Sequence, residues 1–151
     1  YRGEQLMSAR RGFTLAEMIM TLSMASIVLA IVVRPAASFV DHTHANRAAI
    51  VVAGDLDLAR STAVRQREPV RIAFDALTMT YTISTRSSGT VLKQRVLGVA
   101  SDFKLKTARF SPAAIDVFPS GVSSAALTVT LGGADFTRTV TMSRVGMVRA
   151  P

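Results

Sequence analysis

Residues 13–33, FTLAEMIMTLSMASIVLAIVV, decide the fold, because the stretch is apolar throughout and contains a single charged residue, Glu17. As an α-helix it would be roughly 30 Å long at about 1.5 Å per residue, which matches the hydrocarbon core of a bilayer. Arg10 and Arg11 precede it. The positive-inside rule therefore predicts a transmembrane helix with a cytoplasmic N-terminus.

Three interpretations fit this basic segment followed by an apolar one. A secretory signal would be cleaved near residues 35–38, but the apolar run is longer than such signals usually are. A plain uncleaved anchor would tolerate Glu17 near the headgroups. The third interpretation gives Glu17 a purpose, since a carboxylate in an apolar helix costs roughly 2.5–3.5 kcal/mol near the bilayer centre and marks a partner. Cleavage between Gly12 and Phe13 would create an α-ammonium that could pair with Glu17 of a neighbouring subunit.

Residues 11–17, Arg-Gly-Phe-Thr-Leu-Ala-Glu, followed by the apolar run, resemble the class III signal of type IV pilins and type II secretion pseudopilins. The resemblance implies that prepilin peptidase cleaves between Gly12 and Phe13 and that the Phe13 amine is N-methylated. It also implies that Glu17 guides the assembly of subunits. Met7 would then start a short basic leader.

The rest of the sequence predicts one long helix and then strands. Val52, Leu56, Ala59 and Ala63 recur at helical spacing, so the helix is expected to run over residues 14–67, with a kink or local loosening at Pro35. Apolar alternation then predicts strands at residues 70–75, 79–85, 91–97, 106–110, 115–118, 125–131, 136–143 and 145–149, with a turn at 119–121 and a hairpin at 132–133.

This layout predicts an α+β, pilin-like fold, in which a long N-terminal helix packs on an antiparallel β-sheet domain. The expected divisions are a leader peptide, a transmembrane first half of the helix, an amphipathic continuation and a β-rich globular domain. Their ranges are 1–12, 13–33, 34–67 and 68–151.

Three segments of the second half resemble the GspH/FimT group of minor pilins and pseudopilins. They are residues 58–65 (LARSTAVR), the Phe-Pro-Ser-Gly turn at 118–121 and the closing strand at 138–149. The resemblance implies a structural subunit of a type II secretion pseudopilus or a type IV pilus. Its implied partners are other pilin or pseudopilin subunits, prepilin peptidase, the inner membrane and assembly platform proteins. The implied location is the bacterial inner membrane, crossed once with the globular domain periplasmic, and then the filament.

The alternative function is DNA binding during DNA uptake. The net charge of +8 favours anionic partners, and some FimT-like proteins carry a Gly-Arg-x-Arg tail for this purpose. Here residues 146–149 read Gly-Met-Val-Arg, so the first arginine is absent. Arg138, Arg144 and Arg149 are the candidate contacts, and they would act by neutralising phosphates. The chain has no tryptophan and two tyrosines, which argues against a base-stacking platform and favours the structural role.

No catalytic site, metal site or cofactor is predicted. The chain lacks cysteine and the common catalytic motifs. His42 and His44 are two positions apart, so they would not face one another on a helix, and we expect them to be solvated. Asp55 and Asp57 are interpreted as a polar helix face rather than as a catalytic pair. The protein is therefore not expected to be an enzyme.

Overall fold

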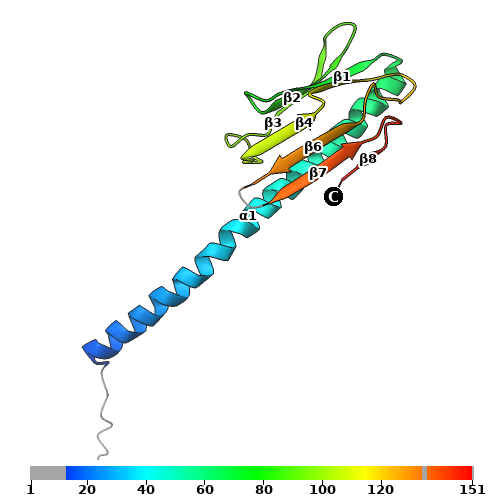
Figure 1. Ribbon diagram of the computed structural model, residues 1–151. Helices are drawn as coiled ribbons and strands as arrows, with labels where there is room; N and C mark the ends of the chain where they lie inside the picture. Colours follow the sequence, from blue (N-terminus) through cyan, green and yellow to red (C-terminus); the bar gives the residue numbers. More distant parts are fainter. Residues whose placement is uncertain (1–12, 134–135, 151) are drawn as a thin grey trace, which may run out of the picture. The chain divides into compact units, whose positions relative to one another are not determined.

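The computed structural model describes residues 13–133 and 136–150, and the side chains of all of these except 32–41. The predicted leader, including Gly12, lies outside the described residues. One helix is followed by eight strands (Figure 1). The elements are α1 (Leu15–Gln66), β1 (Val70–Asp75), β2 (Thr80–Thr85), β3 (Val91–Val96), β4 (Thr107–Ser111), β5 (Ala114–Val117), β6 (Leu127–Gly132), β7 (Thr137–Met142) and β8 (Val148–Arg149).

Local sequence signals explain where α1 begins and ends. At the start, the Thr14 amide donates to Glu17 Oε2 at 3.4 Å and the Glu17 amide donates to Thr14 Oγ1 at 3.3 Å, which is a reciprocal capping box. At the end, Arg67 has a φ of 54° and Pro69 follows, so the backbone leaves the helical conformation. The helix is continuous through position 35.

The predicted α+β class is confirmed, but the strands form two antiparallel sheets rather than one. The first sheet has the order β3-β2-β1-β5 and the second has the order β4-β6-β7-β8. The predicted hairpin joins β6 to β7, where Gly132 pairs with Thr137. The chain switches from the second sheet to the first and back again around β5, which pairs with β1.

The core lies between the second part of α1 and both sheets. The predicted stripe is confirmed, since Val52, Leu56, Ala59 and Ala63 are all buried. The other buried apolar side chains of this helix segment are Ala45, Ala48 and Ala49. Because most of these side chains are small, the helix backbone can approach the sheets closely. Apolar side chains of both sheets complete one cluster with the helix.

Two predictions about α1 can be compared with the structure. The polar helix face predicted at Asp55 and Asp57 is wrong in part, because Asp55 is buried with 6% exposure whereas Asp57 is exposed. A transmembrane helix was predicted at residues 13–33. Among the residues that the structure describes, no helix is long and apolar enough to cross a membrane. The chain divides into two compact units between Ala37 and Ser38.

Candidate functional site

The first turn of α1 carries two of the residues singled out in the sequence. Phe13 is 78% exposed and precedes the helix, and Glu17 lies exposed in the first turn. The carboxylate of Glu17 accepts the Thr14 amide within the capping box, so it also fixes the start of the helix. This second role was missed, although the spacing Thr-x-x-Glu is a known signal for it.

Apolar side chains surround the helix that follows Glu17. Each is more than half exposed, and they occur on every side of the helix: Leu15, Met18, Ile19, Met20, Leu22, Met24, Ile27, Val28, Leu29 and Ile31. The hydroxyls of Thr21, Ser23 and Ser26 donate to carbonyls of the same helix at 2.8–2.9 Å. Their hydrogen bonds therefore need no water, and this helix surface suits an apolar environment.

Arg138, one of the candidate DNA contacts, is half-buried and contacts side chains of the same chain. Its Nε donates to Asn46 Oδ1 of α1 at 2.6 Å, and its guanidinium lies 4.5 Å from the ring centroid of Phe136. The ring of His42 lies against the same Phe136 ring, tilted by 31°, with 3.7 Å between centroids. Arg138 therefore ties β7 to the helix as a structural residue.

The two histidines of the helix have different surroundings. His42 is exposed, but His44 is half-buried rather than solvated, and its buried Nδ1 has no hydrogen-bond partner. No group of three or more potential metal ligands occurs among residues 13–133 and 136–150.

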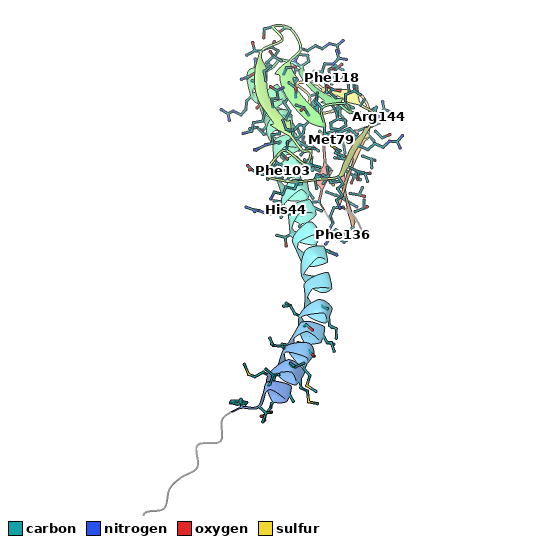
Figure 2. The ribbon with its side chains drawn as sticks, turned by 90° about the vertical axis from the view of Figure 1, so that its left-hand side faces the viewer. His44, Met79, Phe103, Phe118, Phe136 and Arg144 are labelled. Atoms are coloured by element: carbon teal, nitrogen blue, oxygen red, sulfur yellow. The ribbon has the colours of Figure 1, made fainter. Side chains whose placement is uncertain are left out.

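The structure does not bring the three candidate arginines together. Arg144 and Arg149 are both exposed, in the turn after β7 and in β8, whereas Arg138 lies near the β6–β7 hairpin. In Figure 2, Phe118 and Arg144 lie toward one end of the domain, and His44 and Phe136 lie toward the other. Only Arg144 and Arg149 remain as exposed candidates for a shared contact.

Three segments far apart in the sequence meet at Arg60. Its Nε donates to the carbonyl of Gly121 at 3.4 Å. Gly121 and Gly146 have φ values of 79° and 76°, which favour glycine. A Cβ at Gly146 would lie 2.3 Å from the Gly121 oxygen and 2.6 Å from Arg60 Nε. The helix end, the 118–121 turn and the closing segment thus form one packed unit.

A second polar group joins α1 to the first sheet. The Tyr81 hydroxyl donates to Asp55 Oδ2 at 2.5 Å, and Arg95 Nε donates to the same oxygen at 2.5 Å. Burial and the hydrogen bond to Asp55 raise the pKa of the Tyr81 hydroxyl far above its ordinary range. The hydrogen bond to Asp55 also raises the pKa of Arg95. A usable signal was present, because Asp55 lies three residues after Val52 and four before Ala59, on the buried stripe.

Comparison with protein-family models gives two matches. The family of the type II transport protein GspH matches residues 48–146, which include the end of the helix, every strand except β8, and Arg60, Gly121 and Gly146. The prokaryotic N-terminal methylation motif matches residues 7–33, which include Gly12, Phe13 and Glu17. No curated protein matches the chain in sequence.

Solved structures with the same fold include a minor pilin and a minor pseudopilin. The type IV minor pilin FimU of Pseudomonas aeruginosa aligns with a TM-score of 0.60 and 22% identity, over 75% of this chain and 92% of that one. The minor pseudopilin EpsH from the Type 2 Secretion System of Vibrio cholerae aligns with a TM-score of 0.55 and 18% identity, over 72% of this chain and 96% of that one. At these identities the likeness concerns the fold.

Proposed function

This chain belongs to the GspH family and is a minor pilin or pseudopilin of a type IV filament system, and we propose that it assembles into a type II secretion pseudopilus or a type IV pilus through its N-terminal helix. The observation that carries the proposal is the exposed apolar surface of residues 15–31, with the carboxylate of Glu17 in its first turn. Such a surface is costly in water and is covered when several copies of the helix pack side by side. The role is structural rather than catalytic.

The processing that we propose is cleavage between Gly12 and Phe13 by prepilin peptidase, followed by N-methylation of Phe13. The match to the methylation motif supports this step. Phe13 precedes the first helical turn and is exposed, so a bond next to it is not protected by helical hydrogen bonds. The new α-ammonium would pair with Glu17 of a neighbouring subunit. Before this pairing, the chain would be anchored in the membrane and would contact an assembly platform.

The decisive experiment separates the charge of Glu17 from its capping role. Glu17→Ala should abolish incorporation into purified filaments while the variant still fractionates with the inner membrane. The matched control is Thr14→Ala, which removes the capping hydroxyl but keeps the carboxylate, and it should still be incorporated. Normal incorporation of Glu17→Ala would contradict the assembly role.

The processing step has its own test. Gly12→Glu places a charged side chain at the cleavage site and should block conversion to the shorter mature chain. The mass of the protein recovered from membranes measures this conversion. Conversion at the normal rate would contradict cleavage at this bond.

DNA binding during uptake is the second candidate function. It rests on Arg144 and Arg149, which are exposed and make no ion pair within the described part of the chain. Binding through phosphates should weaken steeply with salt. Fluorescence anisotropy with a DNA duplex across a salt series, repeated with Arg144→Ala/Arg149→Ala, tests this candidate. Equal binding by the wild type and the double variant would exclude these arginines.

A further inference from the structure

Two tight turns lie in contact at one end of the domain, and we call them the two-turn surface (residues 118–122 and 143–147). In the first turn the Phe118 amide donates to the Val122 carbonyl at 2.8 Å. In the second, the Ser143 amide donates to the Met147 carbonyl at 2.9 Å. The turns are joined where the Ser123 amide donates to the Arg144 carbonyl at 2.8 Å. The backbone of this surface is therefore well fixed.

Side chains beneath the turns hold them in place. Ser123 is 1% exposed, and its hydroxyl donates to the carbonyls of Ala125 and Ser143 at 2.8 and 3.2 Å. Arg60 donates to Gly121, and Gly146 packs against both of them. Because these contacts order both turns within the folded chain, a partner that binds them would lose little conformational entropy.

The two-turn surface exposes apolar side chains where turns usually carry polar ones. Phe118 is 38% exposed, Val122 41%, Val145 65% and Met147 56%. Nothing in the hydrogen bonding of the turns requires these residue types, since the contacts use backbone groups and Ser143. Clustered exposed apolar side chains on a rigid frame are typical of a protein interface.

Exposed basic side chains lie in and next to this surface. Arg144 is within the second turn and Arg149 follows it, and Arg60, which contacts Gly121 of the first turn, lies near Arg65 in the last part of α1. Two shallow grooves flank the turns. One is lined by Asp57, Arg60, Ser61, Val64 and Arg65, and the other includes Met142, Met147 and Arg149. None of these four arginines forms an ion pair with another described residue.

We propose that the two-turn surface docks a different subunit of the filament, whose contact surface carries Asp or Glu side chains around apolar ones. The inference rests on the proposed function, and it specifies the chemistry of the subunit that binds this end of the domain. Charge complementarity selects the partner, because a second copy of this chain remains basic after the loss of residues 1–12 and would meet the basic rim with an excess of like charge. DNA would satisfy the arginines but would leave Val122 and Val145 without apolar contacts.

The test uses the full chain in cells that assemble the filament. A photo-crosslinking phenylalanine analogue is introduced in place of Val145, and crosslinked peptides are identified by mass spectrometry. The matched control replaces Val91, which is 55% exposed on β3 of the other sheet. Position 145 should crosslink to one filament subunit of different sequence, at a peptide containing Asp or Glu, and position 91 should not.

Charge reversal then tests the chemistry of the contact. Arg144→Glu/Arg149→Glu should lower the crosslink yield at position 145 about tenfold, through like-charge repulsion. Reversing the partner's nearby carboxylate to lysine should restore the yield. Three outcomes would overturn this inference without affecting the proposed function. They are a crosslink to a second copy of this chain, a crosslinked product that nuclease removes, and no crosslink in cells whose purified filaments contain this chain. Absence of the wild-type chain from the filaments would instead overturn the proposed function.

Discussion

The two halves of α1 use apolar side chains in opposite ways. Residues 15–31 expose large, flexible side chains on all sides, whereas residues 45–63 bury a stripe in which most members are alanine. In the second half, small residues allow two sheets of the same chain to approach, so that stretch is stabilised within the monomer. In the first half, the large apolar side chains are all more than half exposed. Helix formation is therefore common to both halves, but burial of the first half requires other molecules.

The carboxylates of the two halves differ in the same way. The exposed Glu17 carboxylate accepts a hydrogen bond from Thr14 in its own helical turn, whereas Asp55 is buried and accepts hydrogen bonds from Tyr81 and Arg95 of the first sheet. Removal of Asp55 should therefore affect the folding of the domain, and removal of Glu17 should affect assembly. Unfolding of the full chain in detergent measures the first of these effects.

The largest effect is expected at Asp55. Asp55→Ala leaves the buried Tyr81 hydroxyl and the Arg95 guanidinium without their acceptor, and it should lower the free energy of unfolding by roughly 2–4 kcal/mol. Arg95 is 31% exposed, which moderates the cost because water can solvate it. Urea denaturation measures the loss. Asp57→Ala is the exposed control and should change the stability by less than about 0.5 kcal/mol.

The next effect distinguishes two glycines. Gly146→Ala introduces a Cβ 2.3 Å from the Gly121 carbonyl at a positive φ, and it should cost roughly 2–3 kcal/mol of unfolding free energy. Gly54→Ala, in the helix, meets no atom within 4 Å and should stabilise the protein by about 0.5–1 kcal/mol. Opposite signs in urea denaturation are the expected result. A neutral Gly146→Ala would show that the two turns move apart easily.

The pH dependence of stability tests the burial of the Tyr81 hydroxyl, which donates to Asp55 in the second half of the helix. Tyr81 has a folded pKa above its ordinary value of 10.0, so its contribution is complete below pH 10 and is lost as the pH rises further. Between pH 10 and 11.5 the wild type should lose up to about 1.4 kcal/mol per pH unit more than Tyr81→Phe. Below pH 9 the two stability curves should run parallel. Parallel curves above pH 10 would contradict the burial of the hydroxyl.

The sequence predicted the parts of this structure that depend on local periodicity. Strand boundaries agree to within two residues except in the last strand, which begins at Val148 rather than at residue 145; alternation with a period of two follows directly from the pleat. The buried stripe of α1 follows from helical spacing in the same way. Division into two sheets was not predicted, because it depends on which distant strands pair, as β5 does with β1.

Distant partners also explain why the polar sites were less predictable. Arg138 was a candidate contact for the alternative function, DNA binding, and its hydrogen bond to Asn46, 92 residues away in the sequence, was not predicted. Asp55 meets Tyr81 and Arg95 at separations of 26 and 40 residues. Residue type alone does not reveal such contacts. The motif around Gly12 and Glu17 is local, which is why the sequence and the family models agree there.

The smallest effect on stability is expected at the start of the helix. Its size measures how much the capping box of Thr14 and Glu17 contributes to folding. Thr14→Ala removes the acceptor of the Glu17 amide at 3.3 Å and should destabilise the first turn by about 1 kcal/mol. Hydrogen exchange at the Glu17 amide should therefore accelerate about fivefold, while Thr14→Ser should retain protection. The urea midpoint of the domain should stay unchanged, because this turn contributes nothing to the core around Leu56. A shifted midpoint would mean that the two halves of the helix unfold together. It would contradict the view that only the second half is stabilised within the monomer.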